Sequence, residues 1–505
     1  MIPLHPSRFL AFDLGASSGR GVLGEIADDR LRTREICRFP NGMIQVCGHL
    51  HWNIFNLFEQ VKNGLKLCAE EPETIPLSVG IDTWGVDFGF LANDGSILGL
   101  PYGYRDSRTD GAMESFFQKI PRERVYGLTG IQFLQLNSLF QLEAMVRDKS
   151  PLLSVARDLL FIPDLLTYLL TGVKKTEFSF ATTSQLYNPI KEDWEEELLS
   201  ALGLPGSLMQ KIEQPGAVFG EIMPDVSKQT GLSPIPVIAV ATHDTASAVA
   251  AVPAAGKDWA YISSGTWSLM GIEIDKPIIT DQSLRLNFTN EGGMENTIRF
   301  LKNIAGLWLL EECRRVWAEK RRCEYDDLLV AATGAVPFAA FIDPDWSEFL
   351  NPPDMPAAIG RSLKSTKQSV PDSPGALVRC ILESMALKYR LVLDQLRRLS
   401  PKPINSIHVI GGGAHNRLLC QFTANATGLP VMAGPVEAAA VGNIMAQALA
   451  AGCVTSLAGM REVISHSFIL EKYEPEHVKE WETAYDTFRE IISAPSRNAS
   501  EGRIP

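Results

Sequence analysis

The sequence predicts an α/β protein built from two lobes, and three observations carry this prediction. The chain of 505 residues is too long for one ordinary hydrophobic core, so two large domains or three smaller ones are expected. Strand-like apolar runs alternate with helix-like segments along the chain. An apolar run followed by a Ser-Ser-Gly turn occurs at 17–19 and again at 263–265, about half the chain length apart. We therefore expect two related lobes with a nucleotide site in the cleft between them.

Composition narrows the class of partner. The chain has 47 basic and 59 acidic residues and a net charge of −12, which argues against nucleic-acid and anionic-membrane partners. Its eight cysteines form no C-x-x-C pair, so reduced thiols are expected rather than a zinc site or a disulfide framework. The start "MIPLHPSRFLAFD" is not typical of a signal peptide. The most apolar later stretch, 236–255, is not expected to span a membrane, because His243, Asp244 and Pro253 interrupt it. We expect a cytoplasmic protein with no obligate protein partner.

The stretch "FLAFDLGASSGRGVLGEI" (9–26) predicts a strand, a turn and a second strand. It contains neither the P-loop pattern nor the dinucleotide-binding pattern. The functional interpretation is a hairpin whose backbone amides bind an anion, with Asp13 beside it to hold a phosphate-bound Mg²⁺. The alternative is an ordinary glycine-containing hairpin, and for this segment taken alone that alternative is favoured.

Three further segments place chemistry-bearing residues at strand ends. "YISSGTWSLMGIE" (261–273) repeats the strand-turn-strand design, and "LSVGIDTWGVDFGFLANDGSIL" (77–98) predicts two strands followed by a hairpin at Asn93-Asp94-Gly95. "SIHVIGGGAHNRLLCQFTANATG" predicts a strand, a glycine triplet at 411–413 and a helix that ends at Gly428. The triplet lets a nucleotide approach the backbone at a helix N-terminus, or it is simply a tight connection.

The segment "PIPVIAVATHDTASAVAAVPAAG" suggests a boundary between the lobes. Residues 237–241 are strand-like, and 246–251 favour a helix that Pro253 stops. We therefore divide the chain into an N-terminal lobe at 1–253, a C-terminal lobe at 254–493 and a polar tail at 494–505. The proline-rich stretch 348–358 is expected to be a surface loop without regular structure.

Asp244 has two interpretations. Aspartate is a good helix N-cap and an alanine-rich segment follows, so capping explains it structurally. A general base at the carboxyl end of a strand explains it functionally, because active sites of open α/β sheets form there. By the same logic His243 and Trp84 are packing residues unless further evidence appears.

Nine motifs together resemble the FGGY family of carbohydrate kinases over about residues 9–470. In chain order they are "FDLGASSGR", "GIDTWGVDF", "YRDSRT", "HDTASAV", "SSGTWSLMG", "TNEGG", "LKNIAGLWLLE", "GGGAHN" and "GPVEAAAVGN". The resemblance implies two actin-like (ribonuclease H-like) lobes and an enzyme that transfers the γ-phosphoryl group of ATP with Mg²⁺. The motifs "GIDTWGVDF" and "LKNIAGLWLL" together resemble those of one subfamily. Its members phosphorylate the 1-hydroxyl of L-rhamnulose in L-rhamnose catabolism.

The resemblance also implies roles for individual residues. The first phosphate loop is Ala16, Ser17, Ser18, Gly19 and Arg20, with Asp13 as the Mg²⁺ partner. Thr266 is implied as the second phosphate contact, and Gly412, Gly413 and Glu311 as nucleotide contacts. Family members often carry Gln where Glu311 stands, so weaker discrimination for ATP is expected here. The implied sugar contacts are Gly85, His243, Asp244, Thr245 and Asn303, with Asp244 as the catalytic base.

Two other functions stay open at this point. One is a kinase for another ketose, such as L-fuculose or xylulose, which fold analogy alone does not separate. The other is a sugar- or nucleotide-sensing protein that kept the fold and lost catalysis. Intact Asp13, Asp244 and both phosphate turns argue against the sensor.

Overall fold

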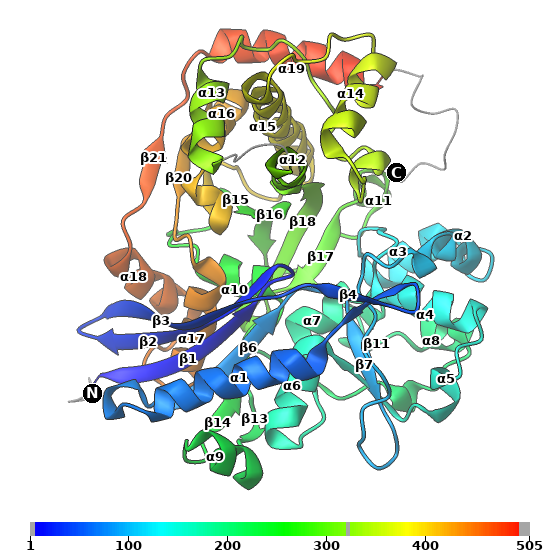
Figure 1. The fold of residues 1–505 in the computed structure, drawn as a ribbon, viewed down its shortest axis with the longest axis vertical. Helices are drawn as coiled ribbons and strands as arrows, with labels where there is room; N and C mark the ends of the chain where they lie inside the picture. Colours follow the sequence, from blue (N-terminus) through cyan, green and yellow to red (C-terminus); the bar gives the residue numbers. More distant parts are fainter. Residues whose placement is uncertain (1–5, 320–323, 494–505) are drawn as a thin grey trace. The chain divides into compact units, whose positions relative to one another are not determined.

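The structure is a computed structural model that describes residues 6–319 and 324–493. The polar tail predicted at 494–505 lies outside the described residues. The chain forms two units, each made of separate stretches of sequence (Figure 1). The first unit comprises the chain up to Ala255, Glu273–Phe300 and Glu437–Phe468, and the second comprises Gly256–Ile272, Leu301–Val436 and the chain from Ile469 onward. The chain first passes from one unit to the other between Ala255 and Gly256, close to the boundary predicted at 253/254. Two later stretches, Glu273–Phe300 and Glu437–Phe468, belong again to the first unit.

The first unit is built on a six-stranded sheet in the order β13-β14-β6-β1-β2-β3. These strands are β1 (Ser7–Leu14), β2 (Ser18–Ala27), β3 (Arg30–Pro40), β6 (Ser78–Thr83), β13 (Val218–Glu221) and β14 (Pro236–Ile238). β1, β6 and β14 run parallel, whereas β2 and β3 continue as antiparallel hairpin strands. The strand-turn-strand predicted at 9–26 is confirmed.

Helices cover both faces of this sheet because its strands are apolar on both faces. Phe12 on β1 packs against Gly64 of α1 (Ile54–Ala69). Gly80 on β6 pairs in register with Ala11, so it faces the other side, where a Cβ would lie 2.5 Å from Asn443 Oδ1 of α17 (Ala438–Ala450). The sheet therefore admits α17 only because position 80 carries no side chain.

The remainder of the first unit extends this core. Short strand pairs are formed by β4 (Met43–Val46) with β5 (His49–Trp52), β7 (Phe88–Leu91) with β8 (Asp158–Phe161), β9 (Thr176–Glu177) with β12 (Ile212–Glu213) and β10 (Tyr187–Asn188) with β11 (Asp193–Trp194). The helices are α2 (Ala112–Phe117), α3 (Arg122–Thr129), α4 (Ser138–Arg147), α5 (Leu152–Val155), α6 (Ile162–Thr171), α7 (Phe178–Thr183), α8 (Glu196–Leu202), α9 (Pro224–Thr230), α10 (Asp244–Ala250), α11 (Asp281–Arg285) and α18 (Leu457–Ser467); strand β17 is Thr289–Gly292.

In the described part of the chain, the second sheet has seven strands in the order β17-β18-β16-β15-β19-β20-β21. Its edge strand β17, given above, lies in a stretch of the first unit, and the other six lie wholly or mostly in the second unit. They are β15 (Trp259–Ser264), β16 (Trp267–Ile274), β18 (Ile298–Ala305), β19 (Ser406–Ile410), β20 (Val431–Ala433) and β21 (Glu471–Tyr473). The helices are α12 (Trp308–Ala318), α13 (Tyr325–Thr333), α14 (Met355–Ser365), α15 (Pro374–Leu399), α16 (Arg417–Thr427) and α19 (Val478–Ser493). The hairpin β15–β16 and the strand-glycine-helix unit 406–428 are confirmed.

One expectation about this unit is wrong. The proline-rich stretch 348–358 is not free of regular structure, because a short 3₁₀ turn ends at Phe349 and α14 begins at Met355. Pro356 sits in the first helical turn, where its missing N–H is not needed, and Asp354 accepts a hydrogen bond from Ala357 N at 2.8 Å. In the part of the chain that the structure describes, no helix is long and apolar enough to cross a bilayer.

Candidate active site

Three carboxylates meet at the carboxyl ends of the parallel strands in the first unit. Asp13 on β1 pairs in register with Asp82 on β6. Beyond β14 the chain continues alongside β6, where Thr83 N donates to Thr242 O at 2.8 Å and Thr83 bridges to His243. The next residue is Asp244. The strand-end position predicted for Asp244 is thus confirmed, as the topology of open α/β sheets leads one to expect.

Burial and repulsion between carboxylates raise the pKa of two members of this cluster, Asp82 and Asp244. Burial, with the charge of Asp13 adding to it, raises the pKa of Asp82 well above its usual range. Burial also raises the pKa of Asp244. The Coulombic effect of His243 opposes this rise, and the negative charge of Asp13 increases it. Asp82 Oδ1 is buried without a hydrogen-bond partner among the described residues. A concentration of carboxylate oxygens of this kind fits a cation nearby.

The turn after β1 contains fewer residues than predicted. Ser18, Gly19 and Arg20 already belong to β2, so the turn itself is 15–17, and Gly15 N donates to Ser18 O at 2.9 Å. Ala16 and Ser17 lie at its tip, and Asn41 Nδ2 braces it through Gly15 O at 2.7 Å. A Cβ at Gly19 would lie 2.4 Å from the Phe39 ring. Gly19 is therefore required for packing against β3.

Arg20 is engaged by two carboxylates. Its Nε and Nη2 donate to Asp13 Oδ2 at 3.0 and 2.6 Å, and Nη1 forms an ion pair with Glu437. Glu437 occupies the N-cap position of α17, so Arg20 links the start of this helix to the end of β1. The sequence did not indicate Glu437. The guanidinium is placed to orient Asp13. The phosphate contact that the family resemblance implies for Arg20 stays a prediction.

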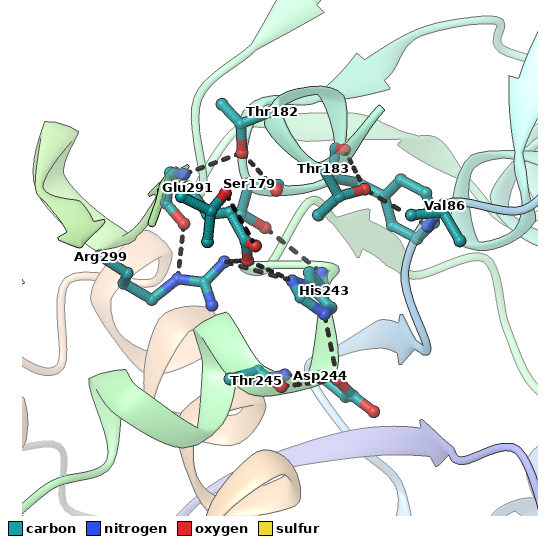
Figure 2. A network of polar contacts seen from close by, with 12 residues as sticks. Val86, Ser179, Thr182, Thr183, His243, Asp244, Thr245, Glu291 and Arg299 are labelled. Carbon is teal, nitrogen blue, oxygen red and sulfur yellow. Dashed lines mark hydrogen bonds and ion pairs between the residues drawn. The ribbon is translucent and has the colours of Figure 1, made fainter. Parts of the chain in front are cut away.

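A buried chain of polar groups supports Asp244 (Figure 2). His243 Nε2 lies 3.5 Å from Asp244 Oδ1, and its Nδ1 lies 3.5 Å from Glu291 Oε2 on β17. Arg299 Nη2 lies 3.2 Å from Glu291 Oε2 and from His243 Nδ1. Although burial alone would raise it, the pKa of Glu291 is held below its usual value by His243 and Arg299. His243 is thus oriented from behind and faces Asp244.

The remaining predicted sugar residues of the first unit lie beside this chain. Asp244 Oδ1 accepts hydrogen bonds from Thr245 N at 2.5 Å and Thr245 Oγ1 at 3.1 Å. A Cβ at Gly85 would lie 3.3 Å from His243 Nε2. The N-cap of α10 is His243, and Asp244 is the first helical residue with 30% of its side chain exposed. The simple capping interpretation of Asp244 is therefore wrong.

Sequence reasoning assigned no role to Asp82, Glu291 or Arg299. The first two lie within motifs already quoted, "GIDTWGVDF" and "TNEGG", but nothing local distinguishes them. Arg299 is fully buried on β18, and its Nε donates to Gly292 O at 2.8 Å. A buried arginine is rarely tolerated without a partner, and this one has Glu291.

In the second unit the two glycine-containing turns lie against each other. A Cβ at Gly413 would collide with the Ser264 side chain, and one at Gly411, where φ is +81°, would lie 3.0 Å from Ser264 O. The turn that carries Thr266 also receives the chain after β18, since Leu307 N donates to Gly265 O at 2.9 Å. Thr266, Gly412 and Gly413 are thus brought into one region, as the two predicted phosphate and nucleotide turns require.

Glu311 and Asn303 complete the predicted set. Asn303 is on β18, which runs directly into α12, and Glu311 lies in the first turn of α12. Glu311 is half exposed and pairs with Arg314 Nη1 at 2.7 Å. A Cβ at Gly412 would meet no atom within 4 Å, so the backbone there is open to a ligand.

Two sheet-based units, each with a strand-turn-strand hairpin, and carboxylates at the strand ends define a phosphotransferase of the actin-like ATPase fold. Models of the FGGY family of carbohydrate kinases match the chain in both halves, the N-terminal domain at 8–251 and the C-terminal domain at 260–451. The chain belongs to the FGGY family of carbohydrate kinases.

Curated relatives match nearly the whole chain. A rhamnulokinase of Bacteroides thetaiotaomicron is 51% identical over 484 residues, covering 96% of this chain and 99% of the relative. A rhamnulokinase of Pectobacterium carotovorum is 44% identical, covering 92% of each chain. A third, from Oceanobacillus iheyensis, is 39% identical, covering 92% of this chain and 97% of the relative.

Solved structures of sugar kinases share the fold. Gluconate kinase from Lactobacillus acidophilus superposes with a TM-score of 0.80 at 17% identity, covering 98% of this chain and 99% of that one. Glycerol kinase from Plasmodium falciparum, solved with ADP, gives a TM-score of 0.78 at 14% identity, covering 97% and 99%. The predicted pair of actin-like lobes is confirmed.

Proposed function

We propose that the protein transfers the γ-phosphoryl group of ATP to the 1-hydroxyl of L-rhamnulose, giving L-rhamnulose 1-phosphate and ADP. A carbohydrate kinase of this family takes ATP as its donor, and the substrate is proposed because relatives up to 51% identical are named rhamnulokinases. The observation that carries the proposal is Asp244, partly exposed and backed by His243, Glu291 and Arg299.

In this mechanism Asp244 accepts the proton of the attacking hydroxyl. Its raised pKa brings it nearer to the range in which a carboxylate serves as a general base. His243, held by Glu291, and Thr245 orient the sugar and Asp244, with Gly85 leaving room in front of the imidazole. Asn303 of the second unit is proposed as a further sugar contact. Positioning of this kind supplies most of what phosphoryl transfer needs.

The ATP site is proposed to bind its ligand mainly through backbone groups of turns and less through charged side chains. We propose that the residues around the first turn and the turn at Thr266 contact phosphates, while three residues of the second unit contact the nucleoside. The first group is Ala16, Ser17, Ser18, Gly19 and Arg20, and the second is Gly412, Gly413 and Glu311. Among the described residues no group of three His, Cys, Asp or Glu side chains is arranged to hold a metal by itself. We propose that Asp13 would hold Mg²⁺, which proteins usually bind through one or two carboxylates plus substrate phosphates, and that the ion would neutralise phosphate charge.

A coupled ADP-release assay tests the proposal. The purified full-length protein is given ATP, Mg²⁺ and, separately, L-rhamnulose, L-fuculose, D-xylulose or no sugar. We expect the highest kcat/KM with L-rhamnulose and a product whose phosphate is on the 1-oxygen by NMR. A higher kcat/KM with L-fuculose or D-xylulose would overturn the substrate assignment. If none of the sugars is phosphorylated, the sensor alternative is favoured instead. The cytoplasmic location and the lack of an obligate protein partner stay predictions from the sequence.

A further inference from the structure

The short helix α7 lies beside the candidate sugar site, although its residues are outside the nine motifs quoted above. Its sequence is Phe-Ser-Phe-Ala-Thr-Thr, and every one of these residues is buried. Ser179, Thr182 and Thr183 carry hydroxyl groups (the α7 hydroxyls) and are at most 4% exposed. Buried polar groups are normally hydrogen-bonded, so the partners of the α7 hydroxyls indicate what this helix does.

Each α7 hydroxyl donates its hydrogen to an acceptor in the helix or at its start. Thr182 Oγ1 donates to Ser179 O at 2.8 Å, and Thr183 Oγ1 donates to Phe180 O at 2.9 Å. Ser179 Oγ donates to Oε2 of Glu177, the N-cap residue of α7, at 2.6 Å. Because its hydrogen is engaged, each hydroxyl oxygen is available only as an acceptor for a donor from another segment.

The three oxygens accept backbone N–H groups from three separate segments of the candidate site (Figure 2). Ser179 Oγ accepts from His243 N at 3.3 Å. The threonine oxygens accept at 2.8 and 3.3 Å, the pairs being Thr182 Oγ1 with Gly292 N and Thr183 Oγ1 with Val86 N. One helix thus binds three segments that are far apart in the sequence.

These three segments meet at the His243 imidazole. His243 is held through its own N–H, and Gly292 follows Glu291, whose Oε2 lies 3.5 Å from His243 Nδ1. Val86 follows Gly85, where a Cβ would lie 3.3 Å from His243 Nε2. The backbone that places the ring and its neighbours on both sides is therefore held by α7.

Two further contacts show how firmly this backbone is held. Val86 has φ of +68°, which is rare for a β-branched residue and is normally retained only where surrounding contacts enforce it. Besides its bond to Thr183, Val86 accepts at its carbonyl oxygen from Ser138 Oγ at 2.5 Å. Glu177 Oε2 also accepts from Thr242 N at 3.0 Å and Thr242 Oγ1 at 2.7 Å, two residues before the proposed base.

We propose that the α7 hydroxyls are positioning groups that set the His243 imidazole, and through it Asp244, in the orientation that phosphoryl transfer needs. The inference rests on the proposed function. Removing one hydroxyl leaves a buried N–H without its acceptor and frees the segment that carries it. A misplacement of about 1 Å in a catalytic arrangement can cost on the order of 10²-fold in rate.

The variants separate the hydroxyl from the shape of the side chain. Thr182→Val and Thr183→Val remove the hydroxyl and keep the branched shape, whereas Thr182→Ser and Thr183→Ser keep the hydroxyl and remove a methyl group. Ser179→Ala removes the third hydroxyl.

Thr230→Val is the matched control. Thr230 is 3% exposed on α9, none of whose residues belongs to the candidate site. Its Oγ1 donates to Val226 O at 3.0 Å and accepts from Leu232 N at 3.4 Å. It therefore repeats the hydrogen bonding of the α7 hydroxyls at a distance from the chemistry.

Steady-state kinetics with L-rhamnulose and ATP, well below the Tm of each variant, give the main readout. We expect kcat to fall about 5- to 50-fold in the valine variants of α7 and in Ser179→Ala, with KM for ATP within about twofold of wild type. Each serine variant should keep a kcat at least about threefold above that of the valine variant at the same position. Thr230→Val should lose a similar amount of Tm, because it also leaves an N–H unpaired, and keep kcat within about twofold.

Amide hydrogen exchange, followed by mass spectrometry, gives a second readout that needs no turnover. Peptides of the wild-type protein that contain Val86, His243 or Gly292 should exchange as slowly as peptides from the core of the sheet. Each should exchange faster in the variant that removes its acceptor. Fast exchange of these peptides in the wild type would overturn the inference, even if no variant of α7 folds.

Three kinetic results would also overturn the inference. One is a kcat within about twofold of wild type in the folded valine and alanine variants. Another is an equal loss in the serine and valine variants, because the methyl group would then be responsible. The third is an equal loss in Thr230→Val, which would indicate general damage. If the wild type does not phosphorylate L-rhamnulose, the proposed function fails, and the exchange measurement still decides whether α7 holds the three segments.

Discussion

At the residue scale, Asp244 combines a poor environment for a charge with a good environment for a reaction. Its carboxylate lies beside Asp13 and Asp82, and burial disfavours its ionised form. A carboxylate kept there at a cost to stability is typical of a functional site. Two predictions follow from this conflict, and one substitution tests both.

Asp244→Asn should lower kcat about 10²- to 10⁴-fold, the usual effect of removing a general base, while L-rhamnulose still binds. The amide keeps an acceptor for Thr245. Calorimetric binding of the sugar and steady-state turnover measure the two effects. The control is Asp354→Asn, which changes a true N-cap aspartate on α14 and should leave kcat unchanged. A folded Asp244→Asn enzyme with more than about a tenth of wild-type kcat would rule out the base.

The same variant should be more stable than wild type at neutral and alkaline pH. Because the pKa of Asp244 is raised in the folded state, its contribution to the free energy of unfolding falls as pH rises from its ordinary value of 3.8 through the folded value. Asparagine does not ionise, so it escapes this loss. We expect Tm to be about 1 to 3 °C higher at pH 8 and the difference to vanish near pH 4, by differential scanning calorimetry. A lower Tm at pH 8 would contradict the cause assigned to the shift.

At the scale of elements, α17 controls the end of β1 in two ways. The residue at its N-cap position, Glu437, pairs with Arg20, which in turn holds Asp13. Further along, Asn443 Nδ2 donates to Asp82 Oδ2 at 2.6 Å, and Gln447 bonds Ser78 Oγ and Leu10 O at 2.8 and 3.0 Å. One helix thus orients both carboxylates at the ends of the paired strands β1 and β6.

Arg20→Met should raise the Mg²⁺ concentration that gives half-maximal activity, by about 3- to 10-fold. The reason is that Asp13 loses two charge-assisted hydrogen bonds and its fixed orientation. Magnesium titrations at saturating ATP and sugar provide the measurement. Arg8→Met is the matched control, since Arg8 also pairs with a carboxylate across β1 and β2, Glu25 at 2.9 Å, away from the strand end. Equal Mg²⁺ dependence in both variants would show that Arg20 does not position Asp13.

Gly80→Ala should destabilise the first unit by about 1 to 3 kcal/mol, the usual cost of overpacking. The new Cβ would lie 2.5 Å from Asn443 Oδ1 and 2.6 Å from Val240 Cγ1, between the sheet and α17. Gly127→Ala is the control, because a Cβ there meets nothing within 4 Å and alanine favours the helix α3. Thermal unfolding of both variants is compared with wild type. The idea of a close sheet-helix contact fails if the two substitutions have the same effect.

At the scale of the whole molecule, the residues assigned to the sugar lie mostly in the first unit and those assigned to the nucleoside in the second. Substitution in one unit should then affect one ligand. Gly412→Val should raise KM for ATP at least fivefold, because the open backbone that a nucleotide approaches becomes covered. Sugar binding without nucleotide and Tm should both be unchanged.

Gly206→Val serves as the control for this prediction, since position 206 is equally open but lies in the first unit, outside the candidate site. Isothermal titration with L-rhamnulose and steady-state kinetics with ATP separate the two ligands. Loss of sugar binding together with ATP affinity in Gly412→Val would contradict the division of roles between the units.

The sequence by itself determined the local parts: both strand-turn-strand hairpins, the strand-glycine-helix unit at 406–428, and Asp244 at a strand end. These depend on apolar periodicity and on glycine and helix-stop chemistry, which act over a few neighbouring residues.

Only the tertiary structure decided what surrounds each site residue. It packed 437–468 with the first unit, so that Glu437 reaches Arg20, and it placed Glu291 and Arg299 behind His243. It also showed that Gly19 is needed against Phe39 and that Asp244 is not a helix cap. Such contacts join residues far apart in the chain, and their energy comes from burial and pairing of charges, which no local pattern in the sequence encodes.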